Sequence, residues 1–325
     1  MELDAKKIQR IIGDSFNVII MAHKNLDLDA LGSSLGMYFL CKKVNKNAFL
    51  LIEETTSEKG VARALKLLKE QQTKINIKTF LELQSLLNEK SLLVILDVHR
   101  ASLTQNKDIF KMINNIIVLD HHIKDSEYID KTLYEYIDSN QSSTSEIVIE
   151  LLKELDIYIP SSIATIMLAG IVVDTNHFSL KTTSFTHEAA SYLYENGAEI
   201  NELQYLLKED LDKYIMRQKI INKLEIVSGN KAIGCGEEND YYRNEEIAKI
   251  ADTMLSFNEV EASFTIARIN DETVGISGRS LGNINVQKIM EKFGGGGHVT
   301  DAAAQIKEES IDLIKQRLLE VFNQL

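Results

Sequence analysis

Five short segments of the chain place carboxylate and imidazole side chains, or glycines and an imidazole, directly after apolar stretches or helical patterns. They cover residues 23–29, 97–99, 120–122, 174–177 and 294–298. Clustered carboxylates and imidazoles are costly unless cations neutralise them. The donors are oxygen and nitrogen without a thiolate, which suits Mn²⁺, Fe²⁺ or Co²⁺ better than structural zinc. The sequence therefore predicts a site for divalent cations. Two such ions about 3.5–4 Å apart would clamp an attacking oxygen and polarise a phosphoryl group.

The segments at 23–29 and 97–99 supply candidate metal ligands. His23, Asp27 and Asp29 stand at short steps after an apolar run, a pattern that turn formation alone explains poorly. Asp97 follows another apolar run and is the candidate carboxylate that reaches both ions. A weaker candidate, expected beside a ligand or at the surface, is His99.

Asp120, His121 and His122 form the most specific motif, because two adjacent histidines after a buried strand have little packing role. Their side chains point in different directions, so one can ligate while the other faces a substrate. Asp174 ends an apolar helix, where its charge opposes the helix dipole, and this placement indicates a compensating cation. His177 is expected beside a ligand or at the surface.

Strands and helices must bring these segments together. Apolar runs at 17–22, 92–96 and 116–119 predict buried strands, and the helical patterns between them predict a parallel sheet with crossover helices. Because ligands bind at the C-terminal edge of such a sheet, the acidic segments are expected to meet there. In the helix expected at 29–43, two glycines four residues apart, Gly32 and Gly36, predict close approach to the sheet.

Two further helices are expected before the second half of the chain. Ser143 and Glu146 form a capping-box pattern that opens a helix at 147–155, and another helix runs from Pro160 toward Asp174. A second α/β pattern follows, with the expected strands and helices at 231–234, 245–256, 260–269, 273–277, 285–293 and 312–322.

The length of 325 residues predicts two domains. We expect an α/β fold with a larger N-terminal parallel-sheet domain and a smaller C-terminal α/β domain, with the active site in the cleft between them. The expected division is a catalytic, metal-binding domain at 1–190, a helical connector at 191–227 and a substrate-binding domain at 228–325.

Composition limits the partners and the compartment. The net charge of −12 and the lack of a basic run disfavour long nucleic acid, so a small nucleotide is the expected phosphate ligand. No apolar stretch is long enough to span a bilayer, and the N-terminus lacks a secretion signal. Cys41 and Cys235 lie in no metal or redox motif, which fits a reducing cytoplasm.

The glycine run at 294–297 can approach a phosphate because no Cβ intervenes, and successive N–H groups there can form an anion-binding nest. His298 and Arg279 would add donors. A flexible helix C-cap and a surface strand residue are the alternative explanations of the run and of Arg279.

The chain resembles the DHH phosphoesterases, named for the triplet found here at 120–122. The resemblance covers nearly the whole chain, and the second half is similar to the DHH-associated domain through 277–280 and 294–298. Four segments resemble the catalytic module of the GdpP-type cyclic-di-AMP phosphodiesterases: 22–25, 169–175, 260–264 and 280–287. Leu26 departs from the proline common in the first motif, which removes no ligand. GdpP-type proteins also carry upstream membrane helices and sensory domains, so we expect a stand-alone enzyme or an excised module.

The resemblance implies two Mn²⁺ ions. Their implied ligands are His23, Asp27 and Asp97 for one ion, and Asp29, Asp97, His121 and Asp174 for the other. The implied substrate-binding residues are Arg279, Ser280, Gly295, Gly296, Gly297 and His298. In the expected mechanism a hydroxide between the metals attacks phosphorus in line with the departing 3′ oxygen. His122 would donate to a phosphate oxygen or the leaving group, and Asp120 would orient one of the histidines.

The function implied by the resemblance is hydrolysis of cyclic di-AMP to the linear dinucleotide pApA, with onward hydrolysis to AMP left open. Short adenine dinucleotides are further expected ligands, and a homodimer is the family expectation. Three alternatives stay open. One is a family enzyme for very short RNA or 3′-phosphoadenosine 5′-phosphate, and another is a manganese pyrophosphatase, against which the glycine run argues. The third is a non-catalytic cyclic-dinucleotide sensor.

Overall fold

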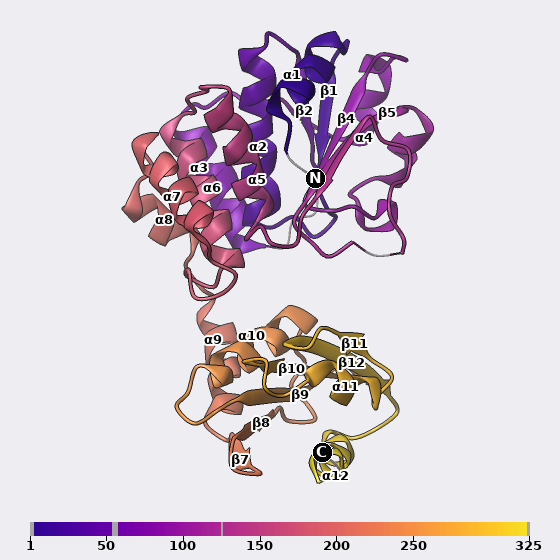
Figure 1. Cartoon of the computed structure of the whole chain (residues 1–325), viewed down its shortest axis with the longest axis vertical. Coiled ribbons are helices and arrows are strands. Elements are labelled where there is room, and N and C mark those ends of the chain that lie inside the picture. The colour runs from indigo at the N-terminus through magenta and orange to yellow at the C-terminus, as the bar shows by residue number, and fades with distance from the viewer. Residues whose placement is uncertain (1–2, 54–57, 125, 324–325) are drawn as a thin grey trace. The chain divides into compact units, whose positions relative to one another are not determined.

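The chain folds into two compact units, Met1–Lys208 and Glu209–Leu325, and each has its own sheet (Figure 1). The computed structural model describes residues 3–53, 58–124 and 126–323. None of the helices in these ranges has the length and apolar character needed to cross a membrane. The expected α/β class with a parallel sheet in the first half is confirmed.

The first unit contains a six-stranded sheet in the order β3-β2-β1-β4-β5-β6, and neighbouring strands are parallel throughout. The strands are β1 (Val18–Met21), β2 (Ala48–Leu51), β3 (Ile77–Lys78), β4 (Leu92–Leu96), β5 (Asn115–Asp120) and β6 (Tyr134–Ile137). The chain order reverses between the neighbours β1 and β4, where open α/β sheets bind ligands outside the carboxyl ends of the strands. The predicted strands at 17–22, 92–96 and 116–119 correspond to β1, β4 and β5.

Both faces of this sheet are covered, which explains why β1 and β4 are apolar at every position. Val18 and Ile20 of β1 pack into one hydrophobic cluster, and Ile19 and Met21 pack into another on the opposite face. The helices on the first face are α1 (Ala5–Asp14), α2 (Leu28–Lys43), α3 (Lys59–Glu70) and α5 (Thr144–Glu154). The second face carries α4 (Phe80–Leu83) and the 3₁₀ turns η1 (Gln84–Leu86), η2 (Ala101–Leu103) and η3 (Lys107–Lys111).

A further helical layer lies beyond α2 and α5. It consists of α6 (Ser161–Asp174), α7 (Ser184–Glu195) and α8 (Ile200–Leu206), and Figure 1 shows α7 and α8 farther from the sheet than α2 and α5. Helix α6 is enclosed by other helices, so it is apolar around its whole circumference. This packing explains a long apolar stretch that ends abruptly at Asp174.

Gly32 and Gly36 share one face of α2, but this face meets α6 and α5, so the predicted approach to the sheet was wrong. A Cβ on Gly32 would lie 2.9 Å from the Cα of Met167 in α6, and a Cβ on Gly36 would lie 2.9 Å from the side chain of Val148 in α5. The two glycines therefore let helices approach each other closely.

Helix α5 begins at Thr144, three residues earlier than predicted, because Ser143 is its N-cap. The Ser143 hydroxyl accepts a hydrogen bond from the Glu146 N–H at 3.1 Å. The Glu146 carboxylate accepts the reciprocal bond from the N–H of Ser142, at 3.1 Å, instead of from Ser143. Helix α6 begins after Pro160 and ends at Asp174, as predicted.

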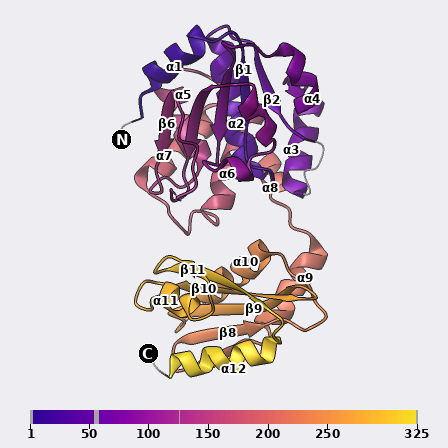
Figure 2. The same ribbon diagram turned by 90° about the vertical axis from the view of Figure 1, so that its right-hand side faces the viewer.

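The second unit contains a mixed six-stranded sheet in the order β11-β12-β10-β9-β8-β7, in which only β8 and β9 pair in parallel. Its strands are β7 (Glu225–Val227), β8 (Lys231–Cys235), β9 (Ala262–Asn270), β10 (Thr273–Ser280), β11 (Gly296–Gly297) and β12 (Asp301–Lys307). One face is covered by α11 (Val286–Glu291) and α12 (Ile311–Phe322), and the other by α9 (Leu211–Ile221) and α10 (Asn244–Leu255). Figure 2 shows α12 and α10 on opposite sides of this sheet.

Candidate metal centre and substrate pocket

Carboxylates and imidazoles from separate segments meet at the C-terminal edge of the first unit's sheet, at the point where the strand order reverses. Three sets of potential ligand atoms each lie within 4.8 Å of one another. The sets are His23, Asp27 and Asp97; Asp97, His121 and His122; and Asp29, His121 and Asp174. All six predicted metal ligands therefore belong to one continuous cluster, in which Asp97 and His121 are each shared by two sets.

Asp97 lies at the centre of this cluster, directly after β4. Its Oδ2 is 3.1 Å from Nε2 of His23, and its Oδ1 is 3.4 Å from Nε2 of His121. The Asp97 backbone has φ +60°, a left-handed conformation that costs free energy in a residue other than glycine. The carboxylate is buried. One of its oxygens faces His23 and the other faces His121.

Asp29 is fully buried in the first turn of α2, and the N-terminus of α5 holds its carboxylate. The N–H of Thr144 donates to Oδ2 at 2.7 Å, and the N–H of Ser145 donates to Oδ1 at 2.9 Å. The helix dipole adds favourable potential for a negative charge at this position. On the other side, Gly170 of α6 packs so closely that a Cβ there would lie 2.7 Å from the Asp29 Cα.

Asp120 lies between two histidines, one buried and one half exposed. Nδ1 of His99 is 2.5 Å from Asp120 Oδ2, and Nδ1 of His122 is 2.7 Å from Asp120 Oδ1. The His122 side chain is 55% exposed, while His99 and Asp120 are buried. The structure thus places His99 behind the site in contact with Asp120, whereas His177 is exposed.

The electrostatics of the cluster show the cost of gathering these groups without a cation. Burial alone would lower the pKa of His23, but hydrogen bonds to Asp27 and Asp97 raise it to about 11. Burial, together with the charges of Asp174 and Asp97, holds the pKa of Asp29 well above its usual range. The carboxylates therefore repel one another, and protons on the histidines compensate only part of their charge.

His121 and Asp174 show the same effect, with Nε2 of His121 3.2 Å from Asp174 Oδ2. Burial alone would lower the pKa of His121, but the hydrogen bond to Asp174 raises it to about 10. Burial raises the pKa of Asp174 to about 6, although its bond to His121 opposes the shift. This buried set of oxygen and nitrogen donors, with mutual repulsion among its carboxylates, fits divalent cations.

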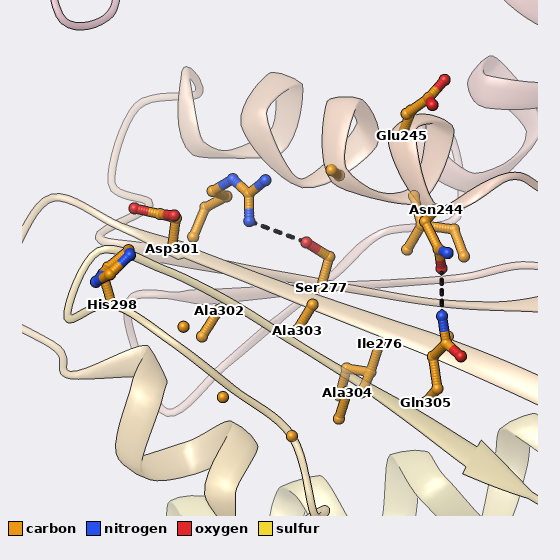
Figure 3. A pocket seen from close by; sticks show the side chains of 17 residues that line it. Asn244, Glu245, Ile276, Ser277, His298, Asp301, Ala302, Ala303, Ala304 and Gln305 are labelled. Carbon is orange, nitrogen blue, oxygen red and sulfur yellow. Dashed lines mark hydrogen bonds between the residues drawn. The ribbon is translucent and has the colours of Figure 1, made fainter. Parts of the chain in front are cut away.

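The second unit holds a pocket of about 600 Å³ on the sheet face that also carries α10 (Figure 3). Of the predicted substrate-binding residues, Arg279, the glycines 295–297 and His298 line it. Ser280 does not line it; its buried hydroxyl donates to the carbonyl of Ile284 at 2.6 Å. Figure 3 shows His298 and Asp301 at one end of the pocket, with Asn244 and Gln305 at the other. Asn244 and Gln305 were not predicted from the sequence.

The Arg279 side chain is fixed within this pocket. Its Nε donates to Asp252 Oδ1 of α10 at 2.8 Å, and a terminal nitrogen donates to Ser277 Oγ at 3.0 Å. Two residues of the glycine run at 294–297 require glycine for different reasons. Gly294 has φ +73°, which suits a helix C-cap, and a Cβ on Gly295 would lie 2.2 Å from the Ala303 carbonyl oxygen.

The predicted nest of successive N–H groups is not formed at the start of the glycine run. The N–H of Gly294 donates to the carbonyl of Glu291, and that of Gly295 donates to the carbonyl of Met290. These groups close the end of α11 and are not available to an anion. The run shapes the pocket wall by keeping side chains away from β12.

Comparison with known proteins agrees with this geometry. The family described as "DHH family, N-terminal domain" matches residues 17–171, and the DHHA1 domain matches residues 228–324. The chain belongs to the DHH family. Asp120, His121 and His122 are therefore its DHH triplet.

Two curated relatives extend this result. The chain is 39% identical over 322 residues to the cyclic-di-AMP phosphodiesterase GdpP of Geobacillus thermodenitrificans. The alignment covers 97% of this chain and 48% of that protein. The chain therefore spans about half the length of this relative. It is 26% identical over 322 residues to the bifunctional oligoribonuclease and PAP phosphatase NrnA of Thermus thermophilus, covering 98% of this chain and 92% of that protein.

A solved structure shares the fold of this DHH protein. An exopolyphosphatase-related protein from Bacteroides fragilis superposes with a TM-score of 0.78, covering 98% of this chain and 96% of that one. The sequence identity is 18%, so this likeness concerns the fold alone.

Proposed function

We propose that this chain is a metal-dependent phosphodiesterase that hydrolyses cyclic di-AMP to pApA. The observation that carries the proposal is the Asp97 carboxylate, whose two oxygens lie 3.1 Å from His23 and 3.4 Å from His121. A carboxylate shared in this way is what a pair of closely spaced cations needs. The name of the 39%-identical relative supports cyclic di-AMP as the substrate.

The proposed ligands form two sets that share Asp97, one set for each ion. His23, Asp27 and Asp97 would hold one ion, and Asp29, Asp97, His121 and Asp174 would hold the other, with Mn²⁺ as the proposed metal. When bound, such ions polarise a phosphoryl oxygen and make water acidic enough to supply a nucleophile near neutral pH. The close grouping of His23, Asp27 and Asp97, and that of Asp29, His121 and Asp174, support this division, and the 3.4 Å distance from Asp97 Oδ1 to His121 Nε2 joins Asp97 to the second set.

His122 is the proposed proton donor to the leaving 3′ oxygen. Its Nδ1 is engaged with Asp120, which leaves Nε2 to face the substrate. Burial would lower the pKa of His122, but its hydrogen bond to Asp120 raises it, which favours the protonated ring that this role requires. Asp120 keeps its charge for this role, because hydrogen bonds to His122 and His99 outweigh burial and hold its pKa well below the usual range.

The pocket of the second unit is the proposed site for part of the dinucleotide. Arg279 and His298 lie on its lining with cationic or hydrogen-bonding groups suited to a phosphate. Small residues such as Gly295 and Ala303 leave room for a base or ribose.

A second candidate is the hydrolysis of very short RNA and 3′-phosphoadenosine 5′-phosphate. It is supported by the relative NrnA, which is 26% identical over 98% of this chain. Both candidates use the same metal centre and differ in the nucleotide that enters it.

Product analysis separates the two candidates. The Mn²⁺-loaded chain is incubated with equal concentrations of cyclic di-AMP, cyclic di-GMP, pApA and 3′-phosphoadenosine 5′-phosphate, and products are resolved by chromatography. The proposal predicts that cyclic di-AMP is consumed fastest and that pApA appears first. Faster turnover of 3′-phosphoadenosine 5′-phosphate or pApA would favour the second candidate. Stable binding of cyclic di-AMP without turnover would contradict both.

A further inference from the structure

Thr144, the first residue of α5, contacts both central carboxylates of the metal centre. Its N–H donates to Asp29 Oδ2 at 2.7 Å, and its side-chain hydroxyl donates to Asp97 Oδ1 at 3.0 Å. The residue has no exposed surface. One threonine thus joins the end of β4, the start of α2 and the N-terminus of α5.

The hydrogen bond from the Thr144 hydroxyl restricts the terminal side-chain torsion of Asp97. The terminal torsion of an aspartate is broad, so the rotation of its carboxylate depends on outside hydrogen bonds. In this structure Oδ2 faces His23 at 3.1 Å and Oδ1 faces His121 at 3.4 Å. Without the bond from Thr144, Oδ1 would be free to move away from His121, whereas Oδ2 would keep its contact with His23 at 3.1 Å. Since each carboxylate oxygen has two lone-pair sites, the bond from Thr144 leaves Oδ1 able to bind a cation.

We propose that Thr144 is a positioning residue whose hydroxyl fixes the carboxylate of Asp97, so that Oδ1 serves the cation held by Asp29 and His121. This inference rests on the proposed function, because it assumes that the cluster binds two ions. The effect falls mainly on one ion, since the hydroxyl contacts Oδ1 and the other ion uses Oδ2. Groups that orient metal ligands typically change metal affinity by about 10–100-fold when removed.

Three substitutions isolate the hydroxyl. Thr144→Val removes it while keeping the shape of the side chain and the N–H that holds Asp29. Thr144→Ser keeps it. Thr165→Val is the matched control: Thr165 is another fully buried threonine near a helix start, and its hydroxyl donates to the Ser161 carbonyl at 2.9 Å, apart from the metal centre.

The test is calorimetric titration of the metal-free full chain with Mn²⁺, supported by paramagnetic resonance of free Mn²⁺. In Thr144→Val we expect one of two binding steps to weaken about 10–100-fold and the other to stay within about threefold. Thr144→Ser and Thr165→Val should keep both steps near the parent values. A thermal melt of each metal-free variant shows whether it is folded.

Two results would overturn the inference. Parent-like affinity for both ions in Thr144→Val would show that the hydroxyl does not orient Asp97 for a cation. Equal weakening of both steps, or a parent that binds a single ion, would contradict the assignment of Oδ1 to one ion. These results are separate from the proposed activity. If the parent fails to hydrolyse cyclic di-AMP while Thr144→Val weakens one ion, the activity proposal fails and the positioning role stands.

Discussion

Replacing Gly170 with alanine tests how tightly the fold holds Asp29. Gly170 lies inside α6, and the added Cβ would approach the Asp29 Cα to 2.7 Å, Asp29 Oδ1 to 3.0 Å and the Leu28 carbonyl oxygen to 3.0 Å. Two of these three atoms are backbone, so no side-chain rotation relieves the contact. Helix α2 must move away from α6 and carry the Asp29 carboxylate with it.

The expected magnitude combines two opposing terms. Alanine in a helix interior is favoured over glycine by about 1 kcal/mol. Overpacking of a tight contact costs about 1–3 kcal/mol. The net loss in free energy of unfolding is therefore about 1 kcal/mol, which lowers the melting temperature of a unit of this size by about 2–4 °C. Metal affinity should fall more clearly, by about 10–100-fold, because Asp29 shifts relative to the N–H groups of α5 that hold it at 2.7 and 2.9 Å.

Gly13→Ala is the matched control. Gly13 lies in α1, and a Cβ there would meet no atom within 4 Å. This variant should keep parent metal affinity and gain up to about 1 kcal/mol of stability. Melting of the metal-free variants and Mn²⁺ titration of the full chain supply both quantities. If Gly170→Ala binds Mn²⁺ like the parent, or gains stability as Gly13→Ala does, the close packing of α6 against Asp29 does not position the site.

Three further predictions concern protons, turnover and substrate binding. Because the pKa values of His23 and His121 are about 11 and 10 without metal, both rings carry protons at pH 7 that a cation must displace. Mn²⁺ affinity should therefore rise by about tenfold per pH unit for each displaced proton between pH 6 and 8. Calorimetry in buffers of different ionisation enthalpy should show the release of these protons. A Mn²⁺ affinity that is independent of pH would refute this prediction. His122→Ala should lower kcat by about 10²–10⁴ with both metals still bound, whereas the surface control His187→Ala should not; unchanged turnover would remove His122 from the mechanism. Arg279→Ala should raise KM for cyclic di-AMP without changing Mn²⁺ affinity, and an equal KM would exclude Arg279 from substrate binding.

The sequence predicted the edge at which the site forms because the relevant strands carry clear signals. β1, β4 and β5 are apolar at nearly every position, and each is followed within two residues by Asp or His. A buried parallel strand needs such a run, so its end is visible in the sequence. β2, β3 and β6 were not predicted. They are only two to four residues long, and in β3, at the sheet edge, Ile77 is exposed and Lys78 is half-buried.

The supporting contacts around the ligands were harder to predict. Thr144 and Ser145 hold Asp29 through backbone N–H groups. A sequence pattern of side chains cannot predict such contacts. The capping box at Ser143 marked the helix start, yet the pairing of that helix end with a carboxylate 115 residues earlier depends on tertiary packing. The partner of the glycine face of α2 was likewise decided by packing, since helix and sheet neighbours favour the same small residues.

Anomalous diffraction at the manganese edge, from crystals of the full chain grown with Mn²⁺, tests the central claim most directly. We expect two peaks about 3.5–4 Å apart on either side of the Asp97 carboxylate, one beside His23 and one beside His121. No peak at Asp97, or manganese bound only outside this cluster, would contradict it.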